Sequence, residues 1–168
     1  KMDWQASALG FGCMRLPVLG DDRSQVDERE ALNMLHYGID HGVNYLDSAY
    51  GYHGGNSERV VGKALKGGYR DKVKIATKLP VRNVQREEDF DRMLGEQMAK
   101  LQVDHIDVYL FHGLRAPRIE IMQKFDLLGK ADRALADGNV EYKGRRDSDS
   151  QLVPQDAICD FLGSRVGS

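Results

Sequence analysis

Four side chains that can take part in acid–base chemistry lie at or just after short apolar stretches of the sequence. They are an acid, Asp47, a phenol, Tyr52, an amine, Lys78, and an imidazole, His112. Taken singly, Asp47 can simply cap a turn, Tyr52 can be a half-exposed aromatic in a glycine-rich loop, and His112 is as readily structural as catalytic. Lys78 is harder to explain, because a lysine is rarely buried among apolar neighbours unless it is paired. Brought together, the four groups would make an acid–base site.

Strand-like and helical patterns alternate along the chain, and they decide whether these side chains can meet. Apolar runs predict strands at 6–16, 43–47, 73–79 and 106–111, and 139–142 could be a fifth. Helical spacing predicts helices after a capping box at Asp27 and Glu30, after Asn56, around 90–101, and over 118–137 with an interruption near Leu128 and Gly129. This alternation predicts a parallel α/β sheet, either open and doubly wound or part of a barrel. In both folds active sites form at the carboxyl ends of the strands, where all four side chains would lie.

Composition excludes several classes of function. The chain has 168 residues, 30% of them charged and 41% hydrophobic, which is typical of a single globular domain. A net charge of -2 provides no basic field for nucleic acid or for an anionic membrane, and no apolar run approaches the length of a membrane span. Cys13 and Cys159 are far apart and lack metal-ligand spacing, so we expect no metal site and a reducing, cytoplasmic environment.

Two other patterns carry little information by themselves. Gly10 and Gly12 form a Gly-x-Gly pair, but the third glycine of a dinucleotide-binding fingerprint and the helix that should follow are both missing. The remaining histidines show no ligand spacing, and the loop position of His53 assigns it no role.

Longer motifs resemble a known family. They are LGFGCMRLP at 9–17, GIDHGVNYLDSAYGY at 38–52, NSE at 56–58, GKAL at 62–65, ATKLP at 76–80 and DHIDVYLFH at 104–112. In this order and at this spacing they resemble the opening of an aldo-keto reductase, over roughly residues 7–144. The likeness is strongest to bacterial members whose full chains end in a cysteine-rich iron–sulfur module.

The resemblance implies a partial barrel. Residues 1–144 would form the amino-terminal half of a TIM-type β/α barrel with parallel strands, truncated after about strand 5, and residues 145–168 would be an unrelated polar tail with a short helix near its end. The activity implied is NADP(H)-dependent reduction of aldehydes or ketones. Tyr52 would protonate the carbonyl oxygen, Lys78 would stabilise the phenolate, Asp47 would pair with Lys78, and His112 would position the substrate.

The resemblance also implies cofactor contacts and their limits. Gly12, Cys13, Met14 and Asp47 would contact NADP(H), whereas most of the contacts to its adenosine and phosphates would lie beyond Gly144 and be missing. We therefore expect weak or absent activity and weak NADPH binding, and the main alternative is a catalytically silent half-barrel that self-associates as a homodimer or higher oligomer. A less favoured alternative is a lyase that uses Lys78 to form a Schiff base.

Overall fold

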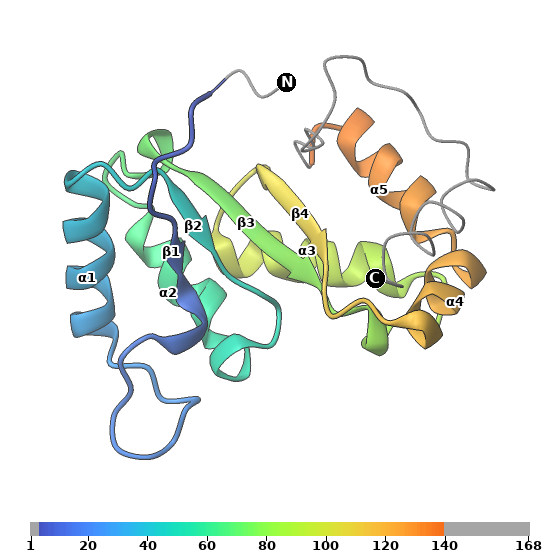
Figure 1. The fold of residues 1–168 in the computed structure, drawn as a ribbon, viewed down its shortest axis with the longest axis horizontal. Helices are drawn as coiled ribbons and strands as arrows, with labels where there is room; N and C mark the ends of the chain where they lie inside the picture. The colour runs from blue at the N-terminus through green and yellow to red at the C-terminus, as the bar shows by residue number, and fades with distance from the viewer. Residues whose placement is uncertain (1–3, 140–168) are drawn as a thin grey trace.

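Four parallel strands form the sheet in the computed structural model, which describes residues 4–139 (Figure 1). They are β1 (Phe11–Gly12), β2 (Tyr45–Asp47), β3 (Lys74–Leu79) and β4 (Val108–Phe111), and they lie side by side in the order of the chain. An open doubly wound sheet reverses its strand order at a switch point, whereas a barrel adds each strand beside the last one. The strand order is therefore that of a barrel segment.

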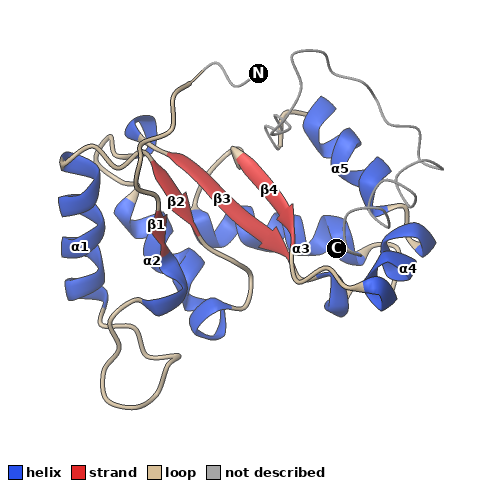
Figure 2. Ribbon diagram, viewed as in Figure 1, coloured by secondary structure: helices blue, strands red, loops and turns tan. Residues whose placement is uncertain are grey.

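The helices are α1 (Glu28–Asp40), α2 (Asn56–Ala64), α3 (Asp89–Leu101), α4 (Ala116–Lys124) and α5 (Leu127–Ala136), with short 3-10 helices η1 (Cys13–Arg15), η2 (Tyr52–Gly55), η3 (Arg70–Lys72) and η4 (Val81–Asn83). Helices α1, α2 and α3 connect successive strands, and α4 and α5 follow β4. Figure 2 shows α2 and α3 on one face of the sheet, behind the strands. Helices on one face and parallel strands confirm the α/β prediction.

The helix boundaries agree with the sequence at most places. The Asp27 side chain accepts a hydrogen bond from Glu30 N over 3.1 Å and so caps α1, as predicted. The helix expected over 118–137 is interrupted, but the break falls at Asp126, slightly before the predicted position. Asp126 has a φ of 47°, which interrupts the helix, and its side chain accepts a hydrogen bond from Gly129 N. Helix α5 therefore begins at the next residue, Leu127.

The first strand is much shorter than the predicted 6–16. Ser7 N donates to Asn44 Oδ1 over 2.7 Å and Asn44 N donates to Ser7 Oγ over 3.1 Å, so side chains take the place of ladder hydrogen bonds there. After Gly12 the chain turns into η1 and buries Cys13. The other strands begin one or two residues later than predicted. The rest of the expected strand at 139–142, and the tail at 145–168, lie outside the described residues.

The main core lies between the sheet and its helices. Ile75 on β3 and Phe90 on α3 are fully buried there. Helices α2 and α3 cross closely at Gly62, where a Cβ atom would lie 2.6 Å from the carbonyl oxygens of Lys100 and Leu101. Only glycine fits at this crossing, so the two helices behind the sheet are held in one arrangement.

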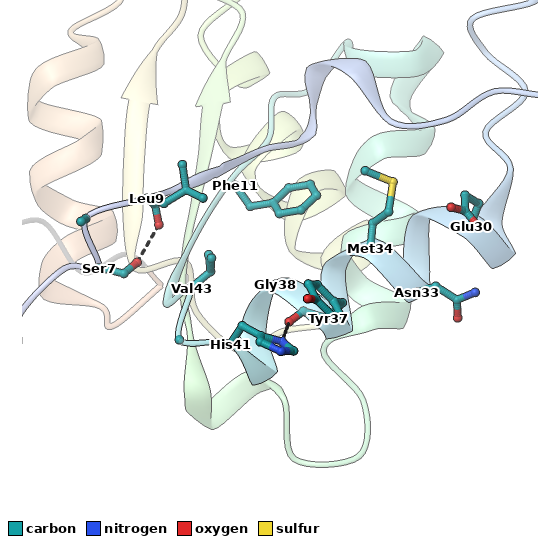
Figure 3. Close-up of a pocket in the computed structure, with 12 residues that line it drawn as sticks. Ser7, Leu9, Phe11, Glu30, Asn33, Met34, Tyr37, Gly38, His41 and Val43 are labelled. Atoms are coloured by element: carbon teal, nitrogen blue, oxygen red, sulfur yellow. Dashed lines mark hydrogen bonds between the residues drawn. The ribbon is translucent and has the colours of Figure 1, made fainter.

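An apolar groove of about 840 Å³ lies between β1 and α1, and we call it the β1–α1 groove. Figure 3 shows Leu9 and Phe11, from the β1 segment, opposite Met34 and Tyr37 of α1. Leu9 is 69% exposed, Tyr37 66% and Met34 40%. Within the described residues β1 pairs only with β2, so its other edge is open beside this groove.

Candidate active site

Lys78 is the centre of the predicted site. Its Nζ lies 2.5 Å from Asp47 Oδ1, 2.6 Å from the carbonyl oxygen of Ser48 and 3.4 Å from the hydroxyl of Tyr52. The Lys78 side chain is only 13% exposed, so these partners stabilise its charge more than water does. Three of the four residues singled out from the sequence are thus joined by hydrogen bonds.

His112 completes the predicted group. Its ring lies 5.8 Å from the Tyr52 ring, centroid to centroid, in an edge-on arrangement at 85°. Partial burial, together with the positive charges of Lys78 and Arg82, lowers the pKa of His112 below its ordinary value of 6.5. The imidazole is therefore neutral at neutral pH, and one of its nitrogens can donate a hydrogen bond to a carbonyl oxygen.

Strand register brings these residues to one edge of the sheet. Gly12 is opposite Asp47 in the pairing of β1 with β2, and Lys78 is opposite Leu110 in the pairing of β3 with β4. His112 follows β4 directly, and its backbone N–H donates to the carbonyl oxygen of Leu79 over 2.8 Å. Consecutive parallel strands thus end together, as the sequence predicted.

His53, whose loop position indicates no role in the sequence, holds the Tyr52 loop. His53 is buried, its Nε2 accepts a hydrogen bond from Leu16 N over 3.1 Å, and its Nδ1 lies 2.6 Å from the carbonyl oxygen of Arg23. Both ring nitrogens therefore have backbone partners if the proton is on Nδ1. Its φ of 53° is unusual for a residue other than glycine, and the two backbone bonds offset that strain.

A buried polar network behind Lys78 was not foreseen. The Glu58 carboxylate accepts hydrogen bonds from Thr77 Oγ1 over 2.6 Å and from Gln97 Nε2 over 2.7 Å. Gln97 Nε2 also lies 3.2 Å from the carbonyl oxygen of Lys78, and Tyr109 donates to Gln97 Oε1. This network fixes the β3 backbone that carries Lys78. A glutamine among the apolar positions of α3 was its one signal in the sequence.

The candidate cofactor contacts on η1 and just before it differ in accessibility. Gly12 is exposed, no atom lies within 4 Å of where a Cβ would be, and Met14 is 51% exposed. The Cys13 side chain is fully buried, and burial, with the nearby charge of Asp47, raises the pKa of its thiol to about 12. Gly12 and Met14 can reach a ligand at this edge with their exposed atoms, whereas the thiol of Cys13 cannot. Ser57 Oγ also donates to the carbonyl oxygen of Cys13.

A pocket of about 220 Å³ opens beside Tyr52 and His112. Arg82 and Asn83 of η4 and Arg118 of α4 also line it. These three residues are not among the predicted site residues, because nothing in their spacing marks them. Their positions after β3 and β4, at the edge where active sites form, are the only signal that could have found them.

Residues 4–139 contain neither a metal-binding cluster nor a membrane-spanning helix. No group of three or more histidine, cysteine, aspartate or glutamate side chains there is arranged to hold a metal ion. None of the helices in that range is long and apolar enough to cross a membrane.

A family comparison agrees with this geometry. The model of the aldo/keto reductase family matches residues 8–137, so the chain belongs to that family. It is 28% identical over 159 residues to probable aldo-keto reductase 1 of Glycine max, covering 89% of this chain and 44% of the relative. It is 34% identical over 116 residues to aldo-keto reductase YhdN of Bacillus subtilis, covering 64% of this chain and 34% of the relative. The iron–sulfur branch suggested by the sequence stays a prediction.

Solved structures give the same fold. An aldo-keto reductase from Bacillus halodurans, in its holo form, superposes with a TM-score of 0.67 at 29% identity, covering 96% of this chain and 51% of that one. An aldo-keto reductase from Klebsiella pneumoniae in complex with NADPH gives 0.61 at 26% identity, covering 85% and 47%. The chain thus spans about half of the length of these solved structures, and its sheet is a partial barrel.

Proposed function

We propose that this chain carries the acid–base part of a site that reduces aldehydes or ketones to alcohols with NADP(H). The observation that carries the proposal is the position of Lys78 Nζ, within hydrogen-bond distance of both the Asp47 carboxylate and the Tyr52 hydroxyl. A carboxylate that holds an ammonium group beside a phenol is an arrangement suited to proton donation from the phenol.

Each side chain has one task in this proposal. Tyr52 donates its proton to the carbonyl oxygen, and Lys78 stabilises the phenolate that remains. Asp47 keeps Lys78 charged and in place. His112, neutral at neutral pH, donates a hydrogen bond that orients the same carbonyl oxygen.

The β1 end of the site fits the reactive end of a nicotinamide cofactor, which when bound would supply the hydride. The exposed Gly12 lies in register with Asp47, and the space where a Cβ would be is open. A flat ring can approach the backbone there without a clash. Gly12, Met14 and Asp47 are the proposed contacts on this chain, together with the backbone of Cys13.

Replacing Tyr52 with phenylalanine tests the proposal. A general acid typically contributes about 100-fold or more to a rate, so Tyr52→Phe should lower NADPH-dependent aldehyde reduction by at least that factor. The matched control is Tyr37→Phe, which makes the same change on the exposed surface of α1. Equal turnover in both variants would show that Tyr52 is not the acid.

NADPH affinity provides a second test. Because the chain spans only about half of the length of its relatives, we propose that only part of the cofactor's surface is contacted and that the dissociation constant exceeds about 1 µM, equivalent to about -8 kcal/mol. Fluorescence titration of NADPH measures it directly. Tighter binding would mean that the cofactor contacts more of this chain than the proposal allows.

A second candidate function is self-association without catalysis, and the β1–α1 groove favours it. Exposed apolar side chains and an open strand edge lie together there, which is a surface that soluble proteins usually cover. A second copy is the occupant we favour, because the four strands within residues 4–139 are half of the eight in a closed barrel, and a second copy could supply the others.

Light scattering at micromolar concentration tests this candidate. The wild type should be a homodimer or larger, and Met34→Glu should shift it towards monomer because a charge would be buried in the contact. Leu19→Glu is the control, since Leu19 is 56% exposed but does not line the groove. A monomer that unfolds cooperatively would rule this candidate out.

A further inference from the structure

The pocket beside Tyr52 holds cationic groups that the proposed reaction does not use. We propose that Arg82 and Arg118 bind an anionic group of the substrate, so that the preferred substrate is a small aldehyde or ketone that also carries a carboxylate or phosphate. This inference rests on the proposed function and adds the substrate class to it.

The two arginines approach the pocket from different elements. Arg82 lies on η4, which follows β3, and Arg118 lies on α4, which follows β4. Both line the same pocket as Tyr52 and His112, and Arg118 Nη1 donates to the carbonyl oxygen of Gly113. That bond holds the Arg118 side chain across the loop that follows β4.

The charges around this pocket are unbalanced. Lys78 is paired with Asp47, but neither Arg82 nor Arg118 has a carboxylate within 4 Å among residues 4–139. The positive charges of Arg82 and Arg118, as well as that of Lys78, act on His112. An anion entering the pocket would meet two guanidinium groups without displacing a carboxylate.

The pocket also limits the size and source of the anion. A volume of about 220 Å³ is smaller than most drug-sized ligand sites, so a short molecule fits best. Asn83 adds an amide donor beside the guanidinium groups. The proposed cofactor contacts lie at or just after the ends of β1 and β2, whereas the arginines follow β3 and β4, the other two strands of the sheet. This separation favours an anionic group of the substrate over the phosphates of the cofactor.

Matched substrates test the inference by turnover. Wild type should reduce 5-oxopentanoate with a kcat/KM at least about 10-fold above that for pentanal, because charge-assisted hydrogen bonds add to binding. Arg82→Gln and Arg118→Gln should lower the ratio of the two kcat/KM values towards 1 and leave the KM for NADPH unchanged. Arg29→Gln on α1 is the control. An equal loss for both aldehydes, or a raised KM for NADPH in the pocket variants, would overturn the inference.

Equilibrium binding separates this inference from the proposed function. Titration with glutarate and with inorganic phosphate, followed by calorimetry, needs no turnover. Binding of at least one anion by wild type and by Tyr52→Phe, weakened at least about 10-fold in Arg82→Gln and Arg118→Gln, would support the anion site even if no aldehyde were reduced. No binding of either anion to wild type, or equal binding to the arginine variants, would overturn it.

Discussion

The carboxyl-end edge of the sheet and the β1–α1 groove differ in how far this chain completes them. At the edge, Lys78 finds a carboxylate, a carbonyl oxygen and a phenol within the first four strands. In the groove, Leu9 and Tyr37 remain more than half exposed. The ammonium group at the polar site finds its hydrogen-bond partners within this chain, whereas the apolar groove stays exposed.

Strand order explains the difference. The catalytic candidates come from neighbouring strands and the loops after them, so this part of a barrel is sufficient to assemble them. The free edge of β1 belongs to the closure of a barrel, which requires strands that come after β4. A partial barrel can therefore hold a formed set of acid–base groups beside an uncovered apolar surface.

The largest effect is expected where the helices behind the site cross. Gly62→Ala would place a methyl group 2.6 Å from two carbonyl oxygens, and we expect a loss of about 3 kcal/mol in the free energy of unfolding. Gly95→Ala is the matched control, because Gly95 lies on the exposed face of α3 and a Cβ there would meet nothing within 4 Å. This substitution should raise the free energy of unfolding by up to about 1 kcal/mol. Urea unfolding measures both. Similar free energies for the two variants would mean that the crossing at Gly62 is not tight.

A smaller loss is expected in the polar network behind Lys78. Thr77→Val removes a hydroxyl that donates to buried Glu58 over 2.6 Å, and should cost about 2 kcal/mol because the carboxylate loses a donor. Thr77→Ser keeps the hydroxyl and should recover much of that loss. If valine and serine were equally tolerated, the network would not be what holds β3 behind the site.

The protonation of His112 should have a still smaller effect on the free energy of unfolding. Its pKa is lowered in the folded protein, so as the pH falls below about 6.5 the unfolded chain takes up the proton first and the folded state loses stability. His112→Asn should reduce the decline in unfolding free energy between pH 7.5 and 5. His41→Asn, on the exposed end of α1, is the control. An unchanged decline in His112→Asn would contradict the partly buried, positively surrounded imidazole.

The smallest effect on stability is expected in the groove. Met34→Gln should change the unfolding free energy of the monomer by less than about 0.5 kcal/mol, because this side chain is 40% exposed and has no apolar cover. Its neighbour Leu35 is fully buried, and Leu35→Ala should cost about 3 kcal/mol. Denaturant unfolding at a protein concentration low enough to give monomers separates the two. A large loss in Met34→Gln would mean that the groove is already filled.

Features that depend on a local sequence pattern could be predicted. Asp47, Lys78 and His112 could be placed together because each ends or follows an apolar run, and Asp27 marked the start of α1 by its capping pattern. The first strand was predicted too long, since an apolar run alone does not show whether a pairing partner is present on both sides.

Contacts between distant side chains could not be predicted in this way. Glu58 and Gln97 are 39 positions apart and meet only because α2 and α3 cross, so neither periodicity nor a motif records the pair. Arg82 and Arg118 share a pocket for the same reason. The contacts of these residues depend on the tertiary structure, which brings their elements together.

Isotope transfer tests the central claim, that Lys78 and its partners form a site for carbonyl reduction. The protein is incubated with an aldehyde and NADPH that carries deuterium at its transferable position, and the alcohol is examined by mass spectrometry. We predict deuterium on the carbinol carbon with wild type and none above background with Lys78→Met, because the phenolate of Tyr52 would lose its stabilising charge. Unlabelled product from wild type, or equal labelling by both proteins, would contradict the claim.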